Sequence, residues 1–186
     1  MIALVSLLAS SALAKDPERV DVLFDFAIGV SLYVHDLDPV EFVAKAPSGP
    51  GVAIRLGERF RVGGMFHAGL PTGLELQVLT DYVPNGFATS GPLLGVSLGG
   101  LAASMNCPYG DDPRCPQPSR TAYAVALGPI AHVRVGWRET IGAERRNGVT
   151  VYTQGGVAWM VASDDPDELS GLYAGGLLGA GLTFDL

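Results

Sequence analysis

Large apolar side chains alternate with small or polar ones along most of the chain. Across residues 22–34 every even position is apolar, whereas the odd positions include Asp25, Gly29 and Ser31. A helix would mix these two groups on one side, but successive side chains of an extended strand point to opposite faces. A period of two over thirteen residues therefore predicts a β-strand with one strongly apolar face.

The same alternation recurs along the chain and predicts eight strands. They cover residues 22–34, 52–57, 60–67, 74–82, 94–99, 123–137, 149–161 and 171–186. Gly57–Arg59 and the Asn-Gly pairs Asn85-Gly86 and Asn147-Gly148 predict short hairpin turns. Residues 35–50, 106–119 and 163–169 predict longer connections at the opposite end of the strands. This arrangement is typical of an up-and-down antiparallel sheet.

The two faces of the predicted sheet differ in bulk. One carries Phe, Val, Ile, Leu and Trp, whereas the other carries Gly, Ala, Ser, Tyr and scattered charges. An eight-stranded barrel has a narrow interior, so the small and polar face fits inside. The bulky face must then lie outside, where it needs lipid, and a sheet in lipid must close on itself. The sequence predicts an eight-stranded, antiparallel, up-and-down transmembrane β-barrel of the all-β class.

Nine aromatic residues fall on the apolar face and predict two aromatic girdles, one near each end of the barrel. They are Phe24, Phe26, Phe60, Phe66, Tyr82, Tyr123, Trp137, Trp159 and Phe184.

Composition narrows the alternatives. The chain has 25 glycines in 186 residues, 48% apolar residues, 17% charged residues and a net charge of -7. It is too apolar for a disordered chain, too acidic for a typical nucleic-acid binder and too rich in glycine for a helix bundle. A helical membrane protein is disfavoured because the uncharged stretch 86–110 contains Pro92 and several glycines. A soluble secreted ligand-binding β-barrel or sandwich remains an alternative.

The first residues have the pattern of a secretory signal peptide. An apolar run ends at Ala12-Leu13-Ala14 and charge begins at Lys15, so we expect a signal peptide over 1–14 and a barrel over 15–186. Cys107 and Cys115 lie in a segment rich in Pro, Gly and Asp, which in a secreted chain predicts a disulfide. Without nearby histidines they do not predict a zinc site.

With these features the chain resembles the small bacterial outer-membrane β-barrels of the OmpA/OmpX type. Its last strand keeps apolar residues at Leu178, Leu182, Phe184 and Leu186, although that family usually finishes in Phe. The resemblance implies a monomer in the bacterial outer membrane of a Gram-negative cell envelope, inserted by the barrel-insertion machinery. It implies lipid and lipopolysaccharide as surroundings, both termini in the periplasm, and no cofactor.

Charged and amide side chains on the inward face are the candidate functional residues. They are Asp25, Arg55, Arg61, Glu75, Gln77, Asp81, His132, Arg134, Gln154 and, near the end, Asp185. Buried charges must be paired, so a salt-bridged plug filling the barrel is the favoured interpretation. The alternative is a narrow, porin-like passive channel for small solutes or hydrophobic molecules, gated by Arg55 and Arg134 exchanging carboxylate partners.

No catalytic or metal-binding residues are predicted. Lipid A deacylases with this architecture use a His and a Ser two residues apart on one strand, next to an acid, and none of His35, His67 and His132 has that spacing. We therefore expect a structural or adhesion-type role rather than an enzyme, with a lipid A-modifying enzyme as the weaker alternative.

Overall fold

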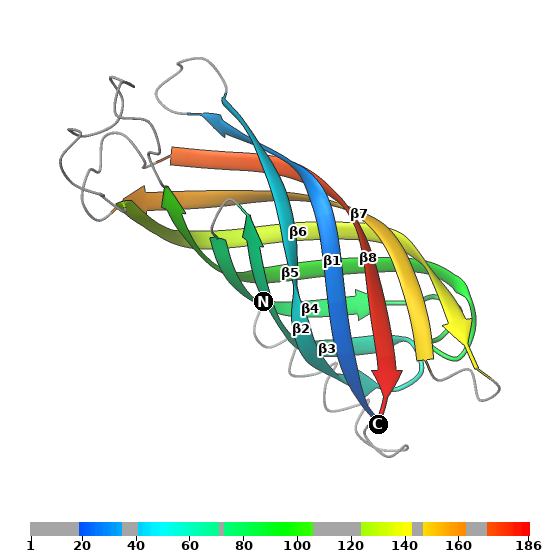
Figure 1. Ribbon diagram of the computed structural model, residues 1–186. Coiled ribbons are helices and arrows are strands. Elements are labelled where there is room, and N and C mark those ends of the chain that lie inside the picture. Colours follow the sequence, from blue (N-terminus) through cyan, green and yellow to red (C-terminus); the bar gives the residue numbers. More distant parts are fainter. Residues whose placement is uncertain (1–18, 35–40, 71–72, 106–123, 143–146, 163–170) are drawn as a thin grey trace.

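A computed structural model describes residues 19–34, 41–70, 73–105, 124–142, 147–162 and 171–186. The predicted signal peptide, Cys107, Cys115 and Tyr123 lie outside these residues. Eight antiparallel strands follow one another around a closed barrel, each paired with its neighbours in sequence (Figure 1). They are β1 (Arg19–Val34), β2 (Glu41–Leu56), β3 (Phe60–Leu70), β4 (Gly73–Tyr82), β5 (Gly91–Met105), β6 (Ala124–Ile141), β7 (Asn147–Ala162) and β8 (Gly171–Asp185).

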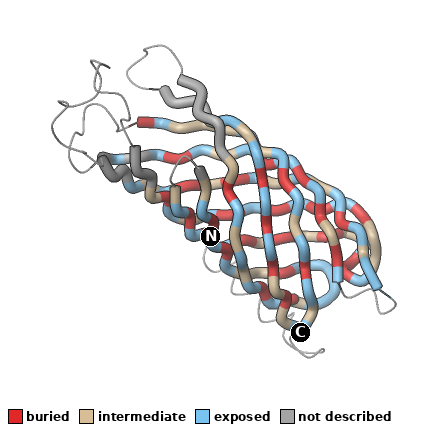
Figure 2. Tube along the Cα trace, viewed as in Figure 1, coloured by how far each residue is buried: buried red, intermediate tan, exposed pale blue. Residues whose placement is uncertain are grey.

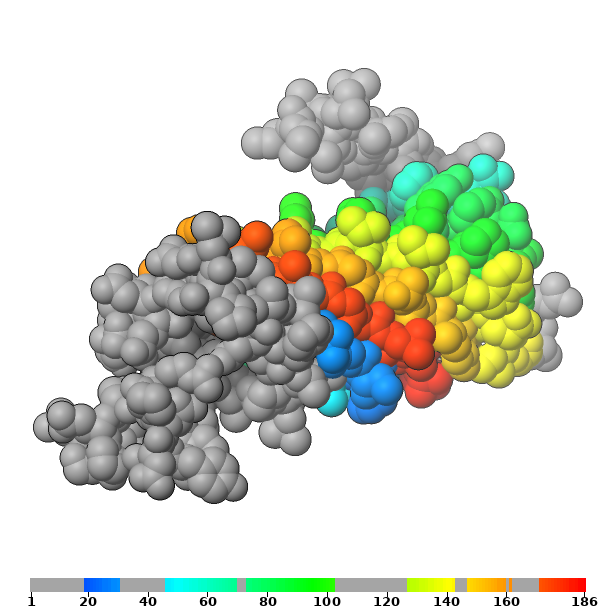
Figure 3. Space-filling view, turned by 90° about the horizontal axis from the view of Figure 1, so that it is seen from above, coloured from blue at the N-terminus to red at the C-terminus, as the bar shows by residue number. Residues whose placement is uncertain are grey.

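Strands β1 and β8 close the barrel. Their register runs from Asp21 opposite Asp185 to Val34 opposite Leu172, and the space-filling view shows the two strands in contact side by side (Figure 3). Closure removes the open edges that a sheet would otherwise expose. Among the described residues, no helix is long and apolar enough to cross a membrane.

Burial alternates residue by residue along the strands (Figure 2). In β1, Leu23 and Ala27 point inward and are 2% and 3% exposed, whereas Phe26 and Ile28 point outward and are 54% and 52% exposed. This arrangement reverses that of a soluble protein, because the bulkiest apolar side chains lie on the outside. The all-β fold and the inside-outside assignment predicted from the sequence are confirmed.

The two ends of the barrel are named here by their connections. At the turn end, β1 begins, β8 ends, and residues 57–59, 83–90 and 142–146 connect successive strands. At the loop end, residues 35–40, 71–72, 106–123 and 163–170 connect the strands.

One predicted connection is wrong. Residues 41–50, assigned to a long loop, form the first part of β2 and pair with β1. Pro47 and Pro50 suggested a loop because proline cannot donate to a ladder. β2 accommodates each proline because that residue is paired on one side only. Pro47 pairs with β3 but not with β1, and Pro50 pairs with β1 but not with β3.

Only one of the two Asn-Gly pairs lies at a turn. Asn147 and Gly148 are the first residues of β7, opposite Ile141 and Thr140, and the positive φ of 87° belongs to Gly142. Asn85 and Gly86 lie in the connection 83–90, where Gly86 has a positive φ of 82° and donates a hydrogen bond to the Val83 carbonyl at 2.9 Å. Asn-Gly favours a positive-φ turn but does not fix its position, because the register of the flanking strands decides where the chain reverses.

Candidate functional site

The nine predicted lumen residues other than Asp185 all face the interior of the barrel. Eight are buried, and the side chain of Arg134 is 11% exposed. They come from six strands: Asp25 from β1, Arg55 from β2, Arg61 from β3, Glu75, Gln77 and Asp81 from β4, His132 and Arg134 from β6, and Gln154 from β7. Asp185 also points inward, with its side chain 3% exposed.

Near the turn end, Asp21 forms ion pairs with two arginines. Its carboxylate accepts two hydrogen bonds from Arg55, at 2.6 and 3.0 Å, and lies 3.5 Å from Arg61 Nη1. Arg61 also donates to Thr183 Oγ1 at 3.1 Å. Because charge-assisted bidentate pairs are the strongest hydrogen bonds between side chains, they fix the orientation of both partners.

Asp81 is the centre of the next pair of contacts. It is fully buried and accepts hydrogen bonds from Arg61 Nε at 2.7 Å and Arg134 Nη2 at 2.6 Å. Arg134 also lies 3.5 Å from Asp25, and its guanidinium carbon is 5.0 Å from the centre of the Tyr152 ring. Each of these buried ions therefore has an opposite charge beside it, which offsets its desolvation.

Inward-facing glycines provide the room for these side chains. A Cβ at Gly179 would overlap the Tyr152 ring, and a Cβ at Gly148 would overlap the Arg138 guanidinium. The glycines of the inner face thus leave space for the few large side chains that cross the lumen.

The connection between β4 and β5 covers the turn end of the lumen. Phe87 is 1% exposed, and its ring centre lies 5.1 to 5.5 Å from the guanidinium carbons of Arg55, Arg61 and Arg138. Arg138 is itself fully buried. Aromatic rings attract cations through their faces, so one phenylalanine interacts with three arginines at once. Between this cap and Arg19, a pocket of about 400 Å³ opens at the turn end.

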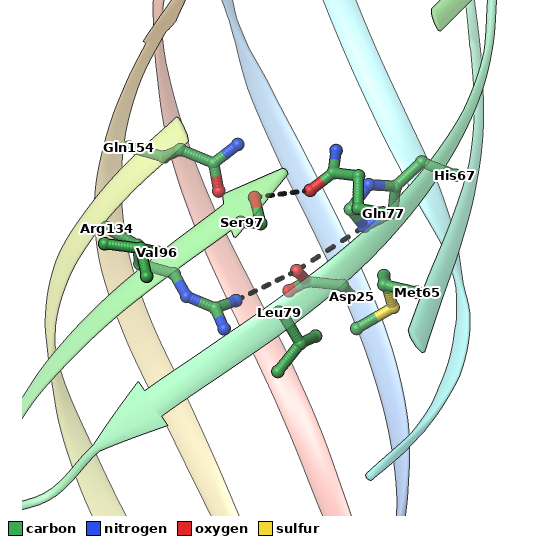
Figure 4. Close-up of a pocket in the computed structure, with 9 residues that line it drawn as sticks. All are labelled: Asp25, Met65, His67, Gln77, Leu79, Val96, Ser97, Arg134 and Gln154. Carbon is green, nitrogen blue, oxygen red and sulfur yellow. Dashed lines mark hydrogen bonds and ion pairs between the residues drawn. The ribbon is translucent and has the colours of Figure 1, made fainter. Parts of the chain in front are cut away.

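A polar tier lies above the ion pairs (Figure 4). Gln77 accepts a hydrogen bond from Ser97 at 2.7 Å. Gln77 also donates to Glu75 at 2.7 Å, and the His67 ring lies between Asp25 and Glu75. The cavity among these side chains measures about 10 Å³. This is about the smallest volume that holds one water molecule.

The fold also brings a serine and a histidine together across β5 and β6. Ser97 Oγ and His132 Nδ1 are 3.4 Å apart, in register opposite one another. An activated nucleophile donates its hydroxyl proton to the base. Here Ser97 donates instead to Gln77 at a shorter distance of 2.7 Å. The pair therefore lacks the arrangement of an activated serine.

Several residues of the lumen were not predicted from the sequence. Asp21 and Arg138 lie just beyond the ends assigned to their strands, and extending the alternation by one residue would have placed both inward. His67 was on the inward face but was not recognised as part of the charge network. Phe87 lies in a connection without periodicity, so no sequence signal indicated its position.

Eight of the nine predicted girdle residues lie among the described residues, and all eight are on the outer face. Seven are between 41% and 56% exposed, and Tyr82 is half-buried against Phe60 with ring centres 4.7 Å apart. Phe24 and Phe184 make an edge-to-face contact at 6.3 Å across the β1–β8 seam.

In the part of the chain that the structure describes, no cluster of three His, Cys, Asp or Glu side chains is arranged to hold a metal ion.

Comparisons with known proteins identify the fold. No protein-family model and no curated protein sequence matches the chain. Among solved structures, Neisserial surface protein A (NspA) aligns with a TM-score of 0.63 and 12% identity, over 90% of this chain and 97% of that one. The N-terminal β-barrel domain of Pseudomonas aeruginosa OprF aligns with a TM-score of 0.52 and 10% identity, over 90% of this chain and all of that domain. The resemblance seen in the sequence is thus confirmed at the level of the fold, which is that of the small eight-stranded outer-membrane β-barrels.

Proposed function

We propose that this chain is an integral barrel of the bacterial outer membrane whose lumen is plugged, with a structural or adhesion-type role. The observation that carries the proposal is the reversed distribution of side chains. Leu76, Leu98 and Val133 are between 60% and 68% exposed on the outer face, whereas Asp21 and Asp81 are fully buried inside. Only an apolar solvent makes such an outer surface favourable.

The plug is supported by the contacts within the lumen. Ion pairs join β1, β2, β3, β4 and β6, and Phe87 caps them at the turn end. The cavity of about 10 Å³ beside Asp25 and Arg134 is far smaller than a path for a hydrated solute. The plugged lumen is therefore favoured over the narrow passive channel.

The adhesion-type role is supported by the asymmetry of the connections. Whereas the longest connection at the turn end is 83–90, the longest of all, 106–123, leaves from the loop end. In the proposed orientation this end faces the cell exterior, among lipopolysaccharide, and the turn end faces the periplasm. A monomer suffices, because the barrel closes without a partner strand.

The proposal is tested with the purified chain in two steps. First, the protein is refolded into detergent and into phospholipid vesicles. We expect vesicle flotation and a faster gel mobility before boiling than after it. A chain that stays soluble and folded without detergent or lipid would contradict the membrane assignment.

Second, the refolded protein is added to a planar lipid bilayer. A plugged lumen predicts no discrete conductance steps above the background of lipid alone. Steps that recur in the wild type and change amplitude in Arg134→Ala would instead support the channel. A variant on the outer face, Thr153→Ala, serves as the control because it leaves the lumen unchanged.

A further inference from the structure

Seven charged side chains of the lumen form a continuous series of alternating sign. Starting near the turn end, the order is Asp185, Arg55, Asp21, Arg61, Asp81, Arg134 and Asp25. Successive members approach to 3.9, 2.6, 3.5, 2.7, 2.6 and 3.5 Å. We refer to this series as the charge ladder. Every acid in it has a base beside it.

His67 stands at the next position of the charge ladder. Its Nε2 lies 3.6 Å from Asp25 Oδ2 (Figure 4). Its Nδ1 lies 3.8 Å from Glu75 Oε2. The side chains of all three residues are less than 10% exposed. A protonated imidazole here would continue the alternation between two carboxylates, whereas a neutral imidazole would interrupt it.

The backbone is built to bring these groups together. His67 is in register with Glu75 on β4, and Asp25 is in register with Gly49 on the intervening strand β2. A Cβ at Gly49 would come within 3.1 Å of the His67 Cα. Because Gly49 has no side chain, the Asp25 carboxylate can reach across β2 to the imidazole.

The surroundings of His67 contain other titratable groups. Arg134 and His132 face the same space from β6, and Tyr152 faces it from β7, packed against Arg134. The described inward positions of β2, β5 and β8 at this level carry Gly49, Ser97, Gly179 and Gly181, which have no charge. Asp25 also pairs with Arg134, and Glu75 also accepts a hydrogen bond from Gln77.

We propose that His67 is a pH-sensitive link that ties the polar tier of the lumen to the charge ladder. This inference rests on the plugged lumen proposed above. Imidazole is the side chain whose charge ordinarily changes in the neutral range. In acid, the imidazolium attracts both Asp25 and Glu75. As the pH rises, His67 loses its proton, the attraction is lost, and the two carboxylates face each other across a neutral ring.

The test compares urea unfolding of the wild type and His67→Gln in phospholipid vesicles between pH 5.5 and 9.5. For the wild type we expect the unfolding equilibrium constant to rise at least about tenfold as the pH increases, since a buried pair is being broken. For His67→Gln we expect a value in acid close to that of the alkaline wild type and almost no dependence on pH. His132→Gln is the matched control and should retain the wild-type dependence. Equal pH dependence in wild type and His67→Gln would overturn the proposal.

A second measurement covers the case in which His67→Gln does not refold. Nitrogen-15 NMR of the imidazole rings of the wild type, in detergent, follows each histidine directly. We expect both ring nitrogens of His67 to carry protons at the acidic end of the range. A His67 ring that remains neutral wherever the barrel is folded would overturn the proposal. Vesicle flotation and bilayer recordings of the same samples report the proposed function separately, so the two failures are distinguishable.

Discussion

The two halves of the lumen are filled by different means. Towards the turn end, buried ions gather around the Phe87 ring, with Asp21, Asp81 and Arg138 fully buried. An apolar cluster accompanies them, made of Leu23, Ala53, Met65 and Leu79. Towards the loop end, Leu101, Ile130 and Ala158 fill it together with glycines. Ions that lose a partner inside a protein are costly, whereas a small apolar side chain can be exchanged at little cost. The turn-end half should therefore determine both the stability of the barrel and the closure of its lumen to ions.

The largest effect is expected from neutralising the fully buried Asp81. Asp81→Asn leaves Arg61 and Arg134 without their shortest ionic contact, and we expect a loss of about 4 kcal/mol of unfolding free energy. Urea unfolding in vesicles measures it. Ile130→Val in the loop-end half serves as the comparison and should cost about 1 kcal/mol. Equal losses in the two variants would remove the distinction between the halves.

Phe87→Ala should follow in size. The substitution removes the ring that contacts three arginines and leaves a cavity above the pocket at the turn end, at a cost of about 3 kcal/mol. We also expect a small leak of ions in planar-bilayer recordings. Phe87→Leu keeps much of the volume without the aromatic face, so it should remain closed. If Phe87→Ala is as stable as the wild type and conducts no more ions, Phe87 neither stabilises the barrel nor closes its lumen.

A charge on the outer face tests the contrast between outside and inside. Leu98 is 64% exposed, and Leu98→Arg would place an ion in the hydrocarbon at a cost of about 2–3 kcal/mol in vesicles. The neighbouring inward residue provides the control: Ser97→Ala should lose about 1 kcal/mol through its hydrogen bond to Gln77. A Leu98→Arg protein that is as stable in vesicles as the wild type would indicate that this surface does not meet lipid.

The smallest effect is expected from adding one methyl group. Gly179→Ala forces the Tyr152 ring to move and should cost about 1–2 kcal/mol. Gly155→Ala is the matched control, because a Cβ there meets nothing within 4 Å on the outer face. Thermal or urea unfolding of the two variants should separate them. Similar stabilities would mean that the interior tolerates repacking.

The alternation of side chains was enough to predict the fold and the inward or outward side of each residue. In an extended backbone, successive side chains point to opposite faces. Asp25 could therefore be assigned to the inner face and Phe26 to the outer face without knowing which strands lie beside them. Strand ends were harder to predict, because prolines such as Pro47 are tolerated wherever the ladder skips them.

Contacts across strands could not be predicted from the sequence. Which base meets which acid depends on the register between strands, as with Arg134, which meets Asp81 and Asp25 from two different strands. The position of Phe87 depends on how an irregular connection folds back under the barrel.

The central claim is that the outer surface faces lipid. The chain has two tryptophans, Trp137 and Trp159, both on the outer face and 53% and 56% exposed. In vesicles of brominated phospholipids, the account predicts strong quenching of their fluorescence by the lipid and weak quenching by iodide in the water. Strong quenching by iodide, with no effect of the brominated lipid, would show that this surface lies in water and would contradict the account.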